Sequence, residues 1–307
     1  MHKTLQIGKT QWIFVQTPDP ETINNLAQEY DFHEMITNDL LEVNAQSKIE
    51  SSGKHFFLAL SFTKYIPSNG RSVFNELDVI IGDNYIITTI GSESQSFTAL
   101  FDTVSQEDKT IDESYKSSPY YILYRIIDAF YDKTIKSLSF SSQRLLDIQN
   151  SISDGAKNEV IDDLMNEDLN KILIKHNFLS QKDVINDLIN HIDEFHDKQL
   201  KVYFNDLKVK LARIISTINV LTEKNDSLMT AYNTYLGIKS NKSMTRLTFI
   251  NSIFMPLTVI AGIGGMSERS MMTGSQNWRI AYPLFILGCV AIAYITFLIL
   301  RKFFMKK

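Results

Sequence analysis

Cysteine is almost absent from this chain of 307 residues, in which Cys289 is the only one. A single thiol forms no intrachain disulfide and offers no cysteine pair to a metal ion. Residues 1–105 also lack a glycine-rich phosphate loop and a nucleophile elbow. These absences exclude a disulfide-stapled scaffold and remove the common signs of catalysis. We therefore expect that the protein is not an enzyme.

The net charge is also small, at -4, but this average hides two unlike regions. Residues 239–307 contain nine Lys and Arg residues and one acid, Glu268, which gives a net charge of +8. Of the 31 basic and 35 acidic residues in the chain, the other 22 and 34 lie in residues 1–238, a net of -12. An acidic body repels the phosphate backbone, so we expect no nucleic-acid partner.

Two uncharged runs occupy the basic region, at residues 247–266 and 280–300. Each has about 20 residues, the length that a helix needs to cross the hydrocarbon core of a bilayer. Buried core helices are the alternative, but such runs with charged flanks are rare in soluble folds. We expect two transmembrane helices, with Cys289 packed in the second.

The basic residues predict the orientation of the two spans. Lys239, Lys242 and Arg246 precede the first span, and a basic tail at 301–307 follows the second. The connecting loop, 267–279, carries a net charge of +1. The positive-inside rule then places both termini in the cytoplasm and the loop outside. The N-terminal segment has no apolar signal-peptide region, so we expect a cytosolic body anchored in the plasma (inner) membrane.

Residues 1–117 have the pattern of a small α/β domain. A strand-like run lies at 55–65, and two more flank a Gly-Asp-Asn turn at residues 82–84, which predicts a hairpin. An Asp-Pro pair opens a helix at 19–30, with the aspartate as N-cap.

From Ser118 onward the pattern is helical. Residues 118–199 predict a helical hairpin that breaks at Asp154-Gly155, and residues 200–246 predict a stalk helix. The stalk has a stripe with a period of 3.5 residues, in which Asn225 is the one polar position. Asn225 either sets the helix register or is a tolerated polar residue. The stripe is Phe204, Leu207, Leu211, Ile214, Ile218, Leu221, Asn225, Leu228, Tyr232 and Tyr235.

The same spacing continues through seven mostly polar or small positions up to and within the first span. Polar groups inside a bilayer turn toward a bundle interior or water. Two interpretations stay open: the residues line a pore, or they pack against another helix. Two spans enclose no pore alone, so a pore requires a homo-oligomer. The positions are Asn241, Met244, Thr248, Asn251, Met255, Thr258 and Gly262.

These residues closely resemble the pore helix of CorA-type magnesium channels. The matching runs are Asn-Lys-Ser-Met at 241–244, Ile-Phe-Met-Pro-Leu-Thr-Val-Ile-Ala-Gly-Ile at 253–263 and Asn-Trp-Arg-Ile-Ala-Tyr-Pro at 277–283. Tyr-Phe-Asn-Asp at 203–206 resembles the family's Tyr-Phe-x-Asp, so the specific motifs cover residues 203–307. The resemblance implies an α+β membrane protein that forms a funnel-shaped homopentamer. In it, an α/β cytoplasmic domain packs on long stalk helices and two transmembrane helices follow. The seven positions from Asn241 to Gly262, here called the pore stripe, line the pore.

The family's Gly-Met-Asn signature is replaced here by Gly265, Met266 and Ser267. The resemblance assigns these residues to the selective outer mouth, where the family's asparagine ring contacts a hydrated cation. Magnesium gives up its water reluctantly, so such a mouth suits it. Serine makes a wider ring, and Gly264 adds flexibility. The loop is not acidic and concentrates cations poorly. These departures favour one of two outcomes: the mouth binds magnesium less tightly, or it selects a different ion.

The resemblance also gives Asp206 a regulatory role, because in the family cytoplasmic magnesium bridges subunits at this position and closes the channel. Carboxylates repel until a divalent cation lies between them. A solvated aspartate is the alternative. Asn241 and Asn251 would add polar rings to the pore, although Asn251 has an interhelical hydrogen bond as its alternative.

A run of acids and histidines at 191–197 has metal-ligand residue types at helical spacing. The run is His191, Asp193, Glu194, His196 and Asp197. No cysteine accompanies it, and charge is expected on a solvated helix, so we favour a solvated face over a metal site.

We therefore expect a channel or transporter for divalent cations with cation-sensing gating. Magnesium is the favoured ion, and cobalt or nickel are further ones; the same divalent cation serves as transported and regulatory ion. The expected partners are further copies of the chain and membrane lipid. Two alternatives are a transporter of zinc or another cation, as in the ZntB-like branch, and a non-conducting sensor or scaffold.

Overall fold

The computed structural model describes residues 2–42, 47–52, 54–66, 71–91, 95–107, 118–155, 159–195, 198–266 and 278–304. The chain divides into two compact units, Met1–Ala231 and Tyr232–Lys307. The division falls inside a single helix, α6 (Lys198–Met266).

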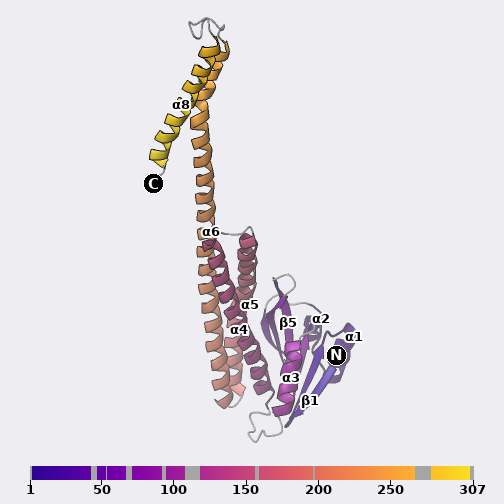
Figure 1. The fold of residues 1–307 in the computed structure, drawn as a ribbon. Coiled ribbons are helices and arrows are strands. Elements are labelled where there is room, and N and C mark those ends of the chain that lie inside the picture. Colours follow the sequence, from indigo (N-terminus) through magenta and orange to yellow (C-terminus); the bar gives the residue numbers. More distant parts are fainter. Residues whose placement is uncertain are drawn as a thin grey trace. The chain divides into compact units, whose positions relative to one another are not determined.

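A six-stranded sheet organises the first unit (Figure 1). The strand order is β1-β2-β6-β5-β4-β3, and every neighbouring pair is antiparallel except β2 and β6. That one parallel pair joins the N-terminal hairpin to the rest of the sheet. The strands are β1 (His2–Ile7), β2 (Thr10–Gln16), β3 (Lys48–Ser52), β4 (His55–Ile66), β5 (Arg71–Ile81) and β6 (Tyr85–Ile90).

Helices cover both faces of this sheet. On one face, α1 and α2 bury a core that includes Ile36 and Phe57. On the other face, α3, α4 and α5 supply aromatic contacts, among them Phe62 stacked on Phe130 with ring centroids 4.3 Å apart. The helices are α1 (Pro20–Tyr30), α2 (Glu34–Leu41), α3 (Gln95–Glu107), α4 (Pro119–Ser153) and α5 (Glu159–Phe195).

The local sequence signals form the predicted elements. Asp19 is the N-cap of α1, and its Oδ1 accepts a hydrogen bond from the backbone N–H of Thr22 at 2.7 Å. Ser118 caps α4 in the same way, through the N–H of Tyr120. Residues 82–84 connect β5 and β6 as an antiparallel hairpin.

Helix α6 runs without a break from the predicted stalk at 200–246 through the first predicted span at 247–266. In the first unit, its stripe is buried from Phe204 to Leu228. Asn225 is also buried, and its Nδ2 donates to the backbone carbonyl of Leu164 in α5 at 3.4 Å. This contact between two helices favours the register-setting interpretation of Asn225.

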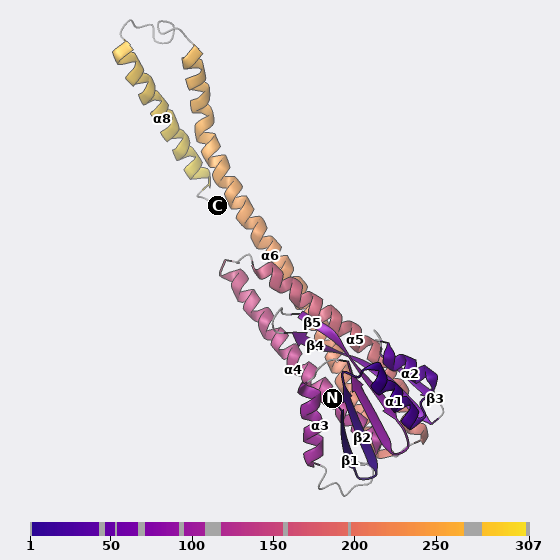
Figure 2. The same ribbon diagram turned by 90° about the vertical axis from the view of Figure 1, so that its right-hand side faces the viewer.

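The second unit pairs the C-terminal part of α6 with α8 (Trp278–Phe304), which lies alongside it (Figure 2). The rings of Phe249 in α6 and Phe297 in α8 pack edge to face, with their centroids 5.8 Å apart. Within the described residues, one helix, Gln199–Gly262, is long and apolar enough to cross a membrane, and Pro283–Ile299 forms a shorter apolar helix.

A buried carboxyl lies in the sheet of the first unit. Asp78 in β5 is 7% exposed, and its Oδ2 accepts a hydrogen bond from the Thr89 hydroxyl at 3.0 Å. Burial raises the pKa of Asp78 well above its usual range, and the neighbouring acids Glu76 and Asp39 act in the same direction. Such a carboxyl contributes stability fully below its unfolded pKa and loses that contribution as pH rises through its folded pKa.

We predict that Asp78→Asn increases thermal stability at pH 8 more than at pH 5, because the amide carries no charge to desolvate. The expected gain in unfolding midpoint at pH 8 is about 2–4 °C, measured by circular dichroism on the full chain in detergent. Asp183→Asn, at an exposed position on α5, is the control and should leave the pH profile unchanged. Equal gains for Asp78→Asn at both pH values would contradict the prediction.

Candidate ion pathway and regulatory site

The seven stripe positions from Asn241 to Gly262 are all exposed in the second unit. Exposure alone does not single them out, because Leu247 and Ile250 on the same helix are exposed too. What distinguishes the seven positions is the direction in which they point around the helix axis. Phe249, Pro256 and Ile260 are partly covered and lie on the face that meets α8. At 100° per residue, the stripe is centred about 140° from that face.

This stripe carries polar groups with different chemistry. The Thr258 hydroxyl donates to the backbone carbonyl of Phe254 at 2.9 Å, so its proton is already used within the helix. Its oxygen lone pairs remain to accept from water or to face a cation. Asn251 offers an amide oxygen about two turns earlier on the same face. Met255 lies between them and is 73% exposed.

Helix α6 ends at Met266, which places the backbone of Gly265 and Met266 in its last turn. Ser267 and the remainder of the predicted outer mouth, up to residue 277, lie outside the described residues. The predicted metal role of these residues therefore stays a prediction.

The predicted regulatory residue, Asp206, is exposed on α6 in the first unit. One turn further along, Lys210 forms ion pairs with Asp128 and Asp132 of α4, the latter at 3.0 Å. We call Asp128, Asp132, Asp206 and Lys210 the acidic cluster. It contains three acids and one base, so its net charge is -2. The sequence analysis missed Asp128 and Asp132, although their spacing of four residues on one helix was a signal that could have indicated them.

The charges of the acidic cluster shift the pKa values of Lys210 and of the neighbouring Tyr124. Burial acts to lower the pKa of Lys210, but hydrogen bonds to Asp128 and Asp132 outweigh it, so that this pKa is raised. Burial raises the pKa of Tyr124 to about 12, and the charges of Asp128 and Asp206 add to this effect. Within the described ranges, no group of three or more His, Cys, Asp or Glu side chains is arranged to hold a metal ion. A shared site would therefore need acids from elsewhere.

His191 has a packing role. Its Nε2 lies 3.0 Å from the Tyr120 hydroxyl, and its ring stacks on Phe56 with centroids 4.4 Å apart. His196 and Asp197 lie outside the described residues. His191 therefore packs against aromatic side chains, whereas the sequence analysis expected a solvated face for this run.

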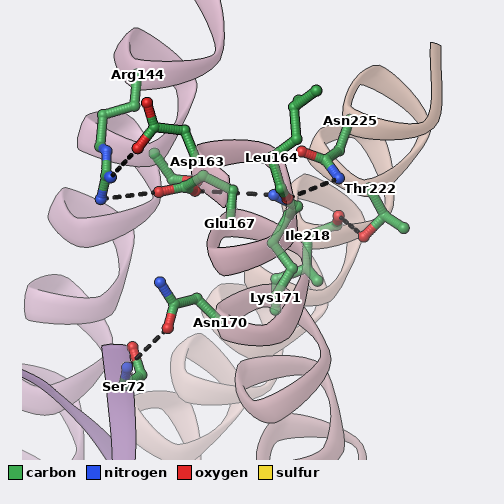
Figure 3. Close-up of polar contacts among 11 residues, drawn as sticks. Ser72, Arg144, Asp163, Leu164, Glu167, Asn170, Lys171, Ile218, Thr222 and Asn225 are labelled. Carbon is green, nitrogen blue, oxygen red and sulfur yellow. Dashed lines mark hydrogen bonds and ion pairs between the residues drawn. The ribbon is translucent and has the colours of Figure 1, made fainter. Parts of the chain in front are cut away.

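Sequence reasoning missed a buried polar group between α4, α5 and β5 (Figure 3). Arg144 Nη1 lies 3.0 Å from Glu167 Oε1, and Lys171 Nζ lies 3.7 Å from Glu167 Oε2. Both Glu167 and Lys171 are almost fully buried. In the sequence, their spacing of four residues has the appearance of an ordinary exposed helical pair, so no local signal marks the burial.

Comparison with known proteins gives one consistent result. The family model described as "CorA-like Mg2+ transporter protein" matches residues 8–302. The chain is 21% identical over 284 residues to the cobalt/magnesium transport protein CorA of Thermotoga maritima, which covers 92% of this chain and 80% of that protein. It is 23% identical over 295 residues to the putative metal ion transporter YfjQ of Bacillus subtilis, covering 94% and 87%.

The fold has a solved counterpart over nearly its whole length. The complete structure of the CorA magnesium transporter from Methanocaldococcus jannaschii matches with a TM-score of 0.78 and 17% identity. The match covers 97% of this chain and 91% of the other.

Proposed function

The chain belongs to the CorA-like Mg2+ transporter protein family, and we propose on that premise that it forms a channel for divalent cations, with magnesium as the favoured ion. Cobalt and nickel are further candidate ions. The family consists of ion transporters, so the chain is not an enzyme. The observation that carries the proposal is the stripe of polar, small and methionine residues on the uncovered face of α6.

We propose a homopentamer in which the stripes of five copies surround an axis. Support comes from the helix faces: α8 covers one side of α6, while the stripe on the far side is exposed among the described residues. Polar groups left in lipid cost free energy, whereas neighbouring copies and water would satisfy them. Around the axis, rings of Asn251 and Thr258 oxygens would face the ion, and rings of Met244 and Met255 would form dewetting constrictions.

In the proposed mouth, Gly265, Met266 and Ser267 contact the hydrated ion. A serine ring is wider than an asparagine ring and offers one hydroxyl in place of an amide. Transport of zinc or another cation, as in the ZntB-like branch, is the second candidate function, and Ser267 is the feature that favours it.

For gating, we propose that cytoplasmic divalent cations bind at Asp206 and stabilise the closed state. The net charge of -2 in the acidic cluster supports this, because a divalent cation relieves repulsion that a single lysine leaves in place. Helix α6 carries both Asp206 and the stripe. We also propose the plasma (inner) membrane as location, with both termini in the cytoplasm, from the basic flanks of the spans.

The proposed pathway predicts that the purified chain carries Mg2+ into proteoliposomes, and that Asn251→Phe reduces uptake at least tenfold because a bulky ring then occupies the axis. Ile250→Phe, one residue away and about 100° off the stripe, should retain uptake near the wild-type rate. Uptake is compared for Mg2+, Co2+, Ni2+, Zn2+ and Na+. No uptake of any of these ions would remove the transport proposal in favour of a non-conducting role. Equal effects of the two variants would remove the stripe from the pathway.

The proposed mouth predicts that Ser267→Asn raises magnesium uptake severalfold and increases block by hexammine complexes, which imitate hydrated magnesium. An amide ring reaches further toward the ion than a hydroxyl ring does. Ser270→Asn, in the same loop, is the control. Unchanged uptake and block in Ser267→Asn would show that position 267 does not select the ion.

The proposed gating site predicts that Asp206→Ala raises, severalfold, the Mg2+ concentration that protects the chain from limited proteolysis. Removing the carboxylate removes a magnesium ligand. Asp226→Ala, also exposed on α6, is the matched control and should leave the curve in place. Identical protection curves for Asp206→Ala and wild type would exclude Asp206 from regulation.

A further inference from the structure

Three basic residues lie at a similar height in the second unit, where α8 ends. Lys242 and Arg246 are exposed on α6, and Lys302 is exposed in the last turn of α8. Helix α8 runs alongside α6 in the opposite direction (Figure 2), and the contact between Phe249 and Phe297 fixes their relative height. Measured along the helix axis from that contact, Arg246, Lys302 and Lys242 lie about 4.5, 7.5 and 10.5 Å away in the same direction. We call these three residues the basic belt.

The charge of the basic belt has no compensating acid in the sequence of the second unit. Glu268 is the one Asp or Glu in residues 232–307, and it belongs to the loop that joins the other ends of α6 and α8. Lys239, exposed about one turn before Lys242, adds a further positive charge. Like charges at this spacing repel one another until an anion lies between them.

The basic belt does not share the face of the pore stripe. At 100° per residue, Lys242 and Arg246 lie about 150° and 170° around α6 from the centre of the pore stripe. Lys242 lies instead on the side of α6 that meets α8 further along the helix. In the proposed homopentamer these bases would therefore face outward toward lipid, and not toward the axis.

Apolar side chains continue from the basic belt along the same side of α6. Ile250, Ile253 and Leu257 follow Arg246 at spacings of four, three and four residues, which keeps them on one side of the helix. Ile250 is 48% exposed, and Ile253 and Leu257 are partly exposed. A cationic end followed by an apolar stripe about 16 Å long matches a phospholipid, which has an anionic head and long acyl chains.

We propose that the basic belt binds an anionic phospholipid of the cytoplasmic leaflet. Arg246, Lys242 and Lys302 hold the phosphate of the headgroup, and one acyl chain lies along Ile250 and Leu257. Guanidinium and ammonium groups are the usual protein partners of phosphate oxygens. The bound lipid links α6 to α8 and so stabilises the second unit. This inference rests on the proposed membrane topology, but it depends neither on the transported ion nor on conduction.

The test is native mass spectrometry of the full chain in detergent, titrated with phosphatidylglycerol or phosphatidylcholine that carry identical acyl chains. We expect a Kd at least tenfold lower for phosphatidylglycerol, because only this lipid has a net negative headgroup. Added NaCl should weaken the binding of phosphatidylglycerol and leave that of phosphatidylcholine in place. Glycerol 3-phosphate separates a soluble phosphate from a lipid as the source of the anion: displacement of the lipid by an equal concentration of it would overturn the assignment to a lipid.

The double variant Lys242→Gln/Arg246→Gln should raise the Kd for phosphatidylglycerol to within about twofold of that for phosphatidylcholine, and Lys302→Gln should raise it severalfold. Lys182→Gln/Lys208→Gln removes two exposed charges from the first unit and is the matched control, which should keep the wild-type preference. Equal Kd values for the two lipids in the wild type would overturn the proposal, and so would a wild-type preference in the Lys242→Gln/Arg246→Gln variant. Uptake of ions into proteoliposomes is a separate measurement, so failure of the lipid site is distinguishable from failure of the transport proposal.

Discussion

The removal of apolar side chains from water is the constraint on which this structure depends, because the two units meet it differently. The first unit has buried apolar cores on both faces of the sheet and along the stalk stripe of α6 from Phe204 to Leu228. The second unit does not: Phe254 and Leu284 are 60% and 72% exposed. Exposed apolar surface of that extent is typical of membrane or protein contact sites, and in the proposed homopentamer lipid and further copies would cover it.

The same constraint separates the two faces of α6 in the second unit. One face has a partner in α8, and the other combines amides, hydroxyls and methionines that lipid alone would leave unsatisfied. This asymmetry is what the proposed pore rests on, because a water-filled axis would satisfy these polar groups better than lipid. Membership in a family of cation transporters is consistent with that requirement.

The sequence predicted the elements that have local causes. Asp19, Ser118 and the turn at 82–84 act through neighbours only a few residues away, and the period of the α6 stripe follows from helix geometry. The strand order of the sheet could not be predicted from local patterns, because the β2–β6 pair joins residues more than 70 positions apart. Lys171 was hidden for a similar reason: burial depends on α4 and β5 arriving from elsewhere, and a lysine four residues from a glutamate has the same local pattern on any exposed helix.

All six strands lie within the first 90 residues, and this has a consequence for synthesis on the ribosome. The sheet can pair completely while its second face still lacks α4 and α5, which end at residue 195. At about 5–20 residues per second, the 105 residues from 90 to 195 take about 5–20 s to emerge. For the first 40 residues of that interval, about 2–8 s, Phe62 has no Phe130 to cover it, so the nascent chain presents an aromatic surface well before its membrane segments are made. A chaperone that recognises nascent apolar surface would thus meet the sheet first, and insertion into the membrane would follow as a later event.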